Sequence, residues 1–464
     1  MFSIELTGLK MAPIASYLPE SQIITLSKDF PALDDPNELK GFITPVQLGI
    51  FFHEWIHFLH NVSTFNGLSS FSIQVVLWSN FRLTMNEQGV SIGSEEIALD
   101  KVGYNKNFIS YLYSNRKKNK GFLPAQAQPN ELSFKNIELL DSVVVDGEVI
   151  GISIIKCEVD YGGNIYDIDI GTFEILESVA FMLESKLILE MNGVPEKAPI
   201  CPYHLVEGLA TEISPSLDKD IIICCMLASL QTNDPPSLLF TLLKDAESLH
   251  ESCRHDELIN YVQNNLKRQL QTIDAQLKQI RLMFPVDEPM GAFVKLTLDR
   301  IESNLVYRMQ NPFFELSIID EISKQANNFN QVIRRYGGCT IIQQRPGDED
   351  DINRDVMYDF VIPGQDDTVS FGWKMAHASF QFASKHFNLL GEIKKSDALQ
   401  YKCPFYTVCG SSVRLSNSNI CAESPWQARH IEDNNDCYYS SAIKATSPPP
   451  KSQVFLLNKA SAEE

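Results

Sequence analysis

The length of the chain, 464 residues, allows one to three domains at roughly 150 residues each. Hydrophobic residues make up 44% of the chain and charged residues 21%, which is ordinary for a globular protein and too apolar for a disordered one. Asp and Glu number 59 against 39 Lys and Arg, so the net charge is −20. So acidic a chain is unsuited to binding nucleic acid or an anionic membrane surface by bulk electrostatics.

Nothing in the sequence predicts export or membrane insertion. The longest apolar run, 221–230, is half the ~20 residues that span a bilayer, and residues 1–13 lack the pattern of a signal peptide. The short basic run 116–120 is typical of a solvated loop. Cys224 and Cys225 lie together in an apolar stretch, which indicates buried free thiols and a reducing compartment. We therefore expect a cytoplasmic protein without nucleic-acid or membrane partners.

The first predicted elements are two short strands, 2–6 and 22–26, followed by a long helix. Thr44 can cap this helix, Pro45 suits its first position, and the segment runs on towards Gly67. The helix is apolar almost all round, which predicts that it is buried. A second apolar helix is expected at 69–85.

The segment 142–170 changes to a β pattern. Asp146-Gly147 between two valine-rich runs is a strong hairpin signal. A second hairpin pairs 152–161 with 165–170, where apolar residues alternate with Asp167 and Asp169. The last strand leads directly into a helix predicted from 172 to 191.

The remainder is predicted to be mostly helical, and the whole chain an α+β protein that is predominantly helical. Helices are expected at 203–213, 219–231, 236–249, 256–284, 290–335 and 370–388, before an extended tail. We divide the chain into a core at 1–250, a helical region at 251–340 and a loop-rich, cysteine-containing region at 341–464. Apolar residues step 4-3-4-3 along 256–284, which favours core packing, with docking of a protein partner on 250–340 as the alternative.

One short motif carries chemistry. His53-Glu54-Trp55-Ile56-His57 matches H-E-x-x-H; on a helix its two histidines share one face and can bind one Zn²⁺. Glu54 then lies where it can take a proton from the water that zinc activates. A chance match in a chain of this composition has a probability of about 1 in 100. His60 lies on the same face, either as a partner of the site or as a hydrogen-bonded core histidine.

The motif resembles that of the zincin metallopeptidases. The metzincin extension is absent, because position 60 is His and position 63 is Ser. The gluzincin pattern takes its third zinc ligand from a later helix, in E-[SG]-x-A. Two glutamates fit: Glu177, the only charge in an apolar run, and Glu207. We favour Glu177, because a buried lone carboxylate must be neutralised and a metal does so.

The resemblance implies further features. It predicts a zincin-like catalytic core in which a small β-hairpin sheet lies beside the active-site helix and an edge strand holds an extended substrate. It also implies a side chain that stabilises the oxyanion, for which Tyr203 and His204 are candidates.

The sequence thus predicts a zinc metallopeptidase that hydrolyses peptide bonds of an intracellular protein. His53, His57 and Glu177 would bind Zn²⁺, and Glu54 would be the general base. The alternatives are a zincin-fold binding protein without activity and a zinc hydrolase of a non-peptide amide.

Four of the ten cysteines lie late in the chain, at Cys403, Cys409, Cys421 and Cys437, with His430 before the last. The spacing between the first two is wider than in common zinc sites. These cysteines are either ordinary free thiols or ligands of a second structural metal or cluster, with the first three as its core.

Overall fold

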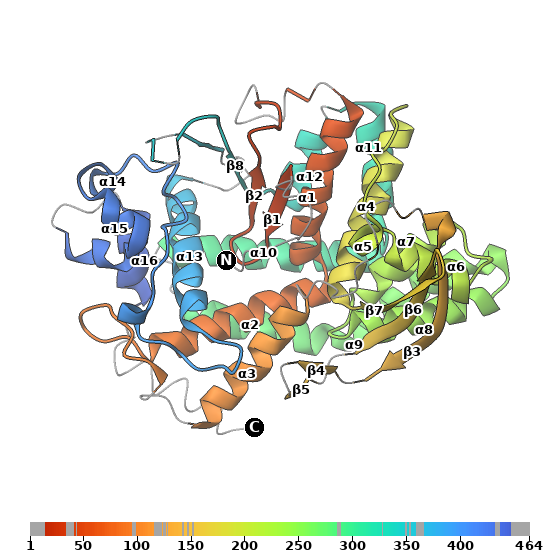
Figure 1. The fold of residues 1–464 in the computed structure, drawn as a ribbon, viewed down its shortest axis with the longest axis horizontal. Coiled ribbons are helices and arrows are strands. Elements are labelled where there is room, and N and C mark those ends of the chain that lie inside the picture. The colour runs from red at the N-terminus through yellow and green to blue at the C-terminus, as the bar shows by residue number, and fades with distance from the viewer. Residues whose placement is uncertain are drawn as a thin grey trace.

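The structure is a computed structural model, mostly helical with small sheets, as predicted (Figure 1). It describes residues 14–446 except 34–40, 43, 95–98, 116–122, 124–126, 128, 142, 146–147, 151–152, 285–288, 327, 349, 352–353, 359–365 and 432–436. The predicted strand 2–6, the Asp146-Gly147 turn, the basic run 116–120 and the tail from 447 lie outside the described residues.

The helix that carries the motif is α1, Pro45–Ser63. Thr44 caps it: its side chain accepts a hydrogen bond from the Gln47 N–H, and the Gln47 side chain accepts one from the Thr44 N–H. Most of α1 is buried, as its sequence predicts. Thr64 ends α1 and caps α2, Phe65–Arg82, so the second helix begins four residues earlier than predicted.

A four-stranded sheet joins the start of the described chain to strands that lie between residues 340 and 358. Its order is β1 (Ala15–Leu18), β2 (Ile23–Leu26), β8 (Thr340–Gln343) and β9 (Val356–Tyr358). β2 pairs in parallel with β8, and the other neighbours are antiparallel. Strands from the first and third predicted regions therefore share one sheet.

The predicted hairpins at 142–170 are present. β4 (Val143–Val145) pairs with β5 (Glu148–Ile150), and β6 (Ile154–Tyr161) with β7 (Asn164–Ile170). An unpredicted strand, β3 (Ser133–Leu140), completes the sheet β3-β6-β7. This sheet packs on later helices, and β7 leads through Gly171 into α4, Thr172–Glu190.

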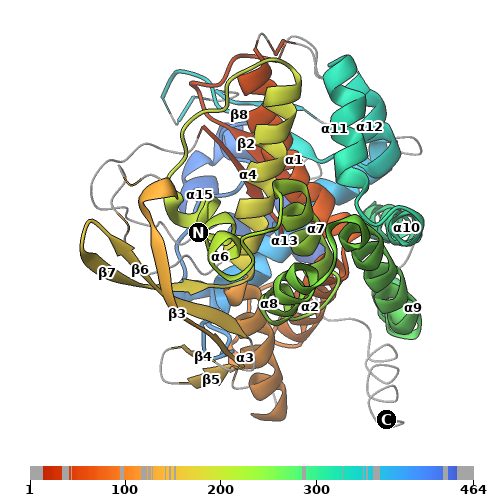
Figure 2. The same ribbon diagram turned by 90° about the vertical axis from the view of Figure 1, so that its right-hand side faces the viewer.

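Helix α4 lies along α1 in both ribbon views (Figures 1 and 2). Gly49 makes this contact close: a Cβ there would lie 2.6 Å from Cδ1 and Cγ1 of Ile188 on α4. Short helices then follow α4 and cover it: α5 (Ile200–Tyr203), α6 (Leu205–Ile213), α7 (Lys219–Ser229) and α8 (Pro235–Ser248). The absence of a side chain at Gly49 thus sets how near the two long helices come.

Five later helices pack on the helices described above. They are α9 (Glu251–Met283), α10 (Pro289–Gln310), α11 (Phe314–Lys324), α12 (Asn328–Tyr336) and α13 (Asp367–His386). α10 packs on both α1 and α13. On α9, the residues of the 4-3-4-3 pattern are buried except Leu270, which is 40% exposed. The unpredicted α3, Leu99–Ser114, lies against α2.

Short elements make up the end of the described chain: α14 (Ser412–Ser416), α15 (Ser418–Glu423) and α16 (Tyr438–Thr446) beside α13 (Figure 1).

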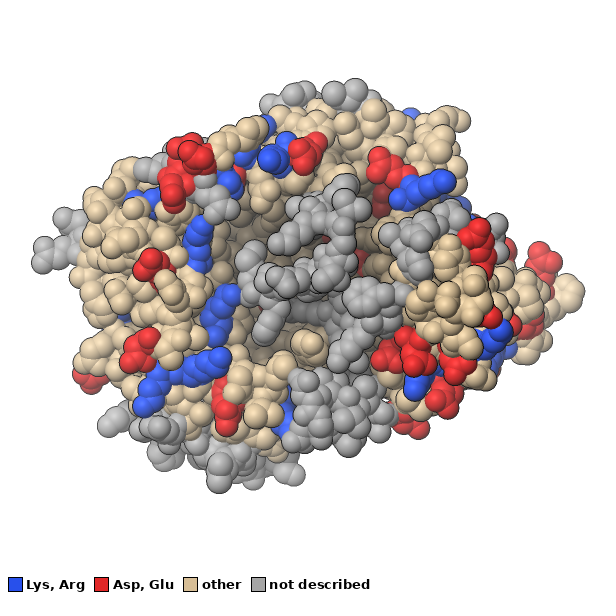
Figure 3. Space-filling model, in the orientation of Figure 1, with Lys and Arg blue, Asp and Glu red and all other residues tan. Residues whose placement is uncertain are grey.

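Charge is unevenly spread over the face in Figure 3. Lys and Arg gather on the left side of the central hollow, and Asp and Glu gather at the right, around the sheet β3-β6-β7.

Candidate metal centre

The two histidines of the motif and Glu177 come together between α1 and α4. His53 Nε2 lies 3.1 Å from His57 Nε2, and the Glu177 carboxylate lies 3.5 Å from His53 Nε2 and 3.7 Å from His57 Nε2. In the part of the chain that is described, this is the set of three potential ligands whose atoms all lie within 4.8 Å of one another. The structure thus brings together the three residues chosen from the sequence.

These separations can be compared with what a zinc ion requires. Zn–N and Zn–O bonds of about 2.0–2.2 Å at a tetrahedral angle place neighbouring ligand atoms roughly 3.4 Å apart. The three separations between His53, His57 and Glu177 run from 3.1 to 3.7 Å. Two neutral imidazoles and one carboxylate are also a donor set that zinc prefers. The residues present therefore fit zinc.

Neighbouring side chains shift the pKa values of two residues in the cluster, Glu177 and His53. Burial alone would raise the pKa of Glu177, but the imidazoles of His57 and His53 outweigh it and hold this pKa well below its usual range. Burial would lower the pKa of His53, whereas Glu177 and Glu184 raise it above its ordinary value. The pKa of His53 is therefore raised by the same carboxylates that would face a bound cation.

Glu54 lies on the same turn of α1 as the ligands. Burial raises the pKa of its carboxyl, the positive imidazoles of His53 and His57 oppose the rise, and the negative Glu177 adds to it. Among the described residues Glu54 forms no hydrogen bond or ion pair. A half-buried carboxylate without a structural partner is available for proton transfer.

Glu184 is a functional candidate that the sequence analysis did not identify. Its Oε2 lies 3.0 Å from Nδ1 of His53, and the residue is 8% exposed. A carboxylate at Nδ1 fixes the imidazole so that Nε2 faces the metal position. The available signal was its place seven residues after Glu177, which puts both carboxylates on one face of α4.

The other candidate ligand, Glu207, is engaged elsewhere. Its carboxylate lies 2.7 Å from Lys219 Nζ and 3.4 Å from His204 Nδ1. The hydrogen bond with His204 and the charge of Lys219 lower the pKa of Glu207 to about 2. The structure therefore brings Glu177, and not Glu207, to the two histidines.

Of the two candidates for stabilising an oxyanion, Tyr203 lies at the cluster. Its ring centroid is 5.8 Å from that of His53. Burial, with the negative charges of Glu177 and Glu54, raises the pKa of its hydroxyl far above the usual value, so the hydroxyl stays a hydrogen-bond donor. His204 instead pairs with Glu207 and packs on Phe181.

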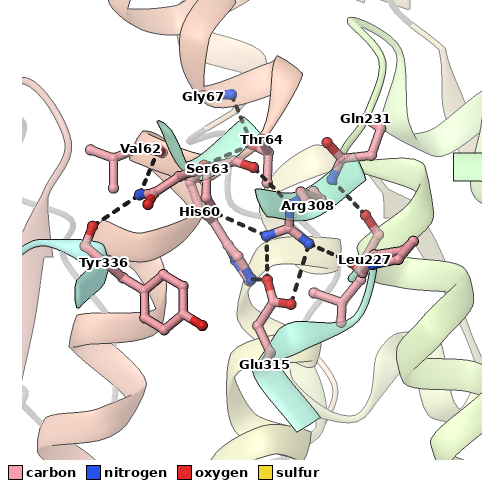
Figure 4. Close-up of polar contacts among 12 residues, drawn as sticks. His60, Val62, Ser63, Thr64, Gly67, Leu227, Gln231, Arg308, Glu315 and Tyr336 are labelled. Carbon is pink, nitrogen blue, oxygen red and sulfur yellow. Dashed lines mark hydrogen bonds and ion pairs between the residues drawn. The ribbon is translucent and has the colours of Figure 1, made fainter. Parts of the chain in front are cut away.

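His60 belongs to a separate buried network at the end of α1 (Figure 4). Its side chain is 1% exposed, and its Nε2 lies 3.7 Å from Glu315 Oε1. Burial and the charge of Arg308 lower the pKa of His60 well below its ordinary value, so it is neutral. Arg308 pairs with Glu315 and donates to the backbone oxygen of Ser63. His60 thus belongs to the buried network that holds the end of α1, and not to the metal cluster.

The strand beside α1 is not one that the sequence analysis placed there. β1 packs on α1, and Tyr17 of β1 stacks on His57, with ring centroids 6.5 Å apart and planes 13° apart. Asn61 donates a 2.9 Å hydrogen bond to the Tyr17 hydroxyl. β1 is an edge strand, and none of the other described strands pairs with its outer side. The sheet β3-β6-β7, which contains the predicted hairpin, contributes to the site through β7, because β7 leads into α4.

No family model matches the chain, and no curated protein and no solved structure is significantly similar to it. None of the described helices is both long and apolar enough to cross a membrane. The cluster between α1 and α4 therefore stands on its own geometry.

Proposed function

We propose that this chain is a zinc-dependent metallopeptidase of the zincin type, in which His53, His57 and Glu177 bind zinc. The proposal rests on one observation, the 3.1–3.7 Å spacing of two imidazole nitrogens and a carboxylate on two buried helices. Three protein ligands leave a fourth coordination position open, which is typical of catalytic zinc sites. A structural site would fill all four positions with protein atoms.

The bound ion would lower the pKa of a water molecule and polarise a substrate carbonyl. Glu54 would take the proton from the attacking water and pass it to the leaving amine. Glu184 would hold His53 in the required orientation through their 3.0 Å contact. Tyr203 would donate a hydrogen bond to the oxygen on which negative charge develops.

A peptide is the substrate that the surroundings favour. The unpaired outer edge of β1 lies beside α1, where Tyr17 stacks on His57. An extended peptide adds to such an edge through main-chain hydrogen bonds. An amide without a peptide backbone would gain nothing from this edge.

The availability of Glu54 argues for an enzyme over a zincin-fold protein that only binds a partner. A purely structural zinc site does not need a general base. Within the described part of the chain, Glu54 contributes no hydrogen bond or ion pair that would explain its half-buried position. The free-energy cost of burying the Glu54 carboxylate is explained if this carboxylate acts in catalysis.

The test compares Glu54→Gln with the wild type on a mixed peptide library, with products identified by mass spectrometry. We expect cleavage by the wild type, and a loss of about 10²–10⁴ in rate for Glu54→Gln with about one zinc retained per chain. Glu207→Gln is the matched control, since Glu207 lies outside the cluster and pairs with Lys219; it should keep both zinc and activity.

Three results would contradict the proposal. Purified wild type without zinc, after metal is supplied, would refute the metal site. Equal cleavage by Glu54→Gln and wild type would refute the assignment of the base. Zinc without cleavage of any library peptide would favour a binding protein or an amidase.

A further inference from the structure

The four late cysteines, which come from separate segments, line one cavity. Cys403 and Cys409 lie in a loop, Cys421 lies on α15, and Cys437 directly precedes α16. The cavity is otherwise lined mostly by aromatic and small side chains. Three of the four cysteines are buried, and none forms a disulfide. Residues up to 34 positions apart (437 − 403) thus present thiols to one space.

Backbone N–H groups point at these sulfurs. Ser411 N lies 3.5 Å from Cys409 Sγ, and Ser440 N lies 3.5 Å from Cys437 Sγ. A backbone hydrogen bond from Phe405 also acts on the Cys403 thiol. The Cys403 N–H donates a 2.8 Å bond to the Cys421 oxygen, which ties the two segments together. Backbone donors aimed at sulfur stabilise thiolate ligands of a metal.

A buried positive charge borders the same cavity. Arg414 is 2% exposed, and its guanidinium donates to the backbone oxygens of Tyr406 and Asp350 at 3.1 and 2.9 Å. Its face lies 3.7 Å from the Tyr406 ring centroid. No described carboxylate forms an ion pair with Arg414. A buried unpaired cation is costly, and a metal group held by four thiolates, which is negative overall, would offset it.

The spacing of the sulfurs distinguishes the kinds of metal group. Zn–S bonds of about 2.3 Å at a tetrahedral angle place sulfurs roughly 3.8 Å apart. Within the described residues, only His53, His57 and Glu177 form a set closer than 4.8 Å, so no three of the four sulfurs do. In a cubic iron–sulfur cluster each thiolate binds a different iron, and the sulfurs stand farther apart than around one ion.

We infer that Cys403, Cys409, Cys421 and Cys437 hold an iron–sulfur cluster, separate from the zinc centre. Around them the chain has only short elements: α14 and α15 span 5 and 6 residues. A cluster would fasten these elements to one another and to α16, which packs on α13. The role that we infer for the cluster is structural, because it would link these short elements to α16.

The test is metal and sulfide analysis of the full chain purified without oxygen from cells supplied with iron. We expect about four iron and four acid-labile sulfide per chain, with a broad visible absorbance. Cys421→Ser should lose the iron, the sulfide and the absorbance. Cys253→Ser is the matched control, because Cys253 is an exposed free thiol on α9, and it should keep all three.

Folding and the zinc proposal are checked separately. Circular dichroism of Cys421→Ser shows whether the helices persist, and His57→Ala should keep its iron whether or not zinc binds. Three results would overturn the inference: wild type without iron and sulfide, a single zinc that is lost in Cys421→Ser, or a disulfide between two of the four cysteines.

Discussion

Helix α1 carries two buried clusters of titratable side chains, and they differ in where positive charge comes from. At the first, His53 and His57 lie with Glu177 and Glu184, and the groups that shift the pKa values of His53 and Glu177 are histidines and glutamates. At the second, two turns further on, His60 lies near Glu315, whose charge is balanced by Arg308. The first cluster holds acids without a fixed cation, and the second holds a complete ion pair.

This difference distinguishes the first cluster, a candidate metal site, from the second cluster, which holds the end of α1 in place. Arg308 and Asn304 of α10 donate to the backbone oxygens of Ser63 and Val62, the last carbonyls of α1. Such donors satisfy groups that every helix end leaves free. The second cluster therefore anchors the helix, while the first uses the anchored helix to present its ligands.

The largest expected effect comes from breaking the anchoring cluster. Arg308→Met leaves Glu315 buried beside a neutral His60 and removes the donors to Ser63. Loss of one partner of a buried pair lowers the free energy of unfolding by about 3–5 kcal/mol. Urea denaturation measures this change.

The control is Arg281→Met, which removes a partly exposed pair with Asp299 and Glu302 and should cost less than about 1 kcal/mol. The double variant Arg308→Met/Glu315→Leu should regain much of the stability, because it removes the stranded carboxylate. Equal costs for the two single arginine variants would contradict the role of Arg308 as an anchor.

Next in size is the removal of the hydroxyl beside the metal cluster. Tyr203→Phe should lower kcat on a peptide substrate by about 10²–10³, with little change in KM and with zinc content unchanged. Steady-state kinetics and metal analysis measure these three quantities. Tyr261→Phe, at a half-buried tyrosine on α9, should leave kcat as it is; a Tyr203→Phe variant as active as this control would remove Tyr203 from the account.

Glu184 tests whether the acids of the first cluster support a metal. Glu184→Gln keeps the shape but removes the charge that faces His53 Nδ1. Zinc affinity should fall by about 10–100-fold, measured by competition with a chelating dye. Glu207→Gln should leave affinity unchanged, and an equal loss in both variants would argue against a specific role for Glu184.

The smallest effect concerns the contact between α1 and α4. Gly49→Ala adds a Cβ 2.6 Å from atoms of Ile188, so the side chain or the helix must move, at about 1–3 kcal/mol. Zinc affinity should fall with stability, because α4 carries Glu177. Gly103→Ala is the control on a helix where the added Cβ meets nothing within 4 Å, and it should not destabilise the protein.

Local patterns made part of this fold predictable. Thr44 and Pro45 mark the start of α1, and Gly162-Gly163 with positive φ makes the turn between β6 and β7. Glu177 could be singled out because it is the only charge in an apolar run. Each of these signals lies within a few residues of the feature that it predicts.

The features that were missed depend on contacts between distant segments. The pairing of Ile23 with Thr340 joins short strands over 300 residues apart, and no local pattern encodes it. The contact of Glu184 with His53 depends on how α4 is rotated against α1. The cysteines were visible as a group, but their meeting at one cavity required the loop geometry.

The most direct test of the central claim is an anomalous difference map, at the zinc absorption edge, from crystals grown with zinc. The account predicts a peak between α1 and α4, about 2.0–2.2 Å from His53 Nε2, His57 Nε2 and a Glu177 carboxylate oxygen. A map without a peak at this position, or with a peak on Glu207 instead, would contradict it.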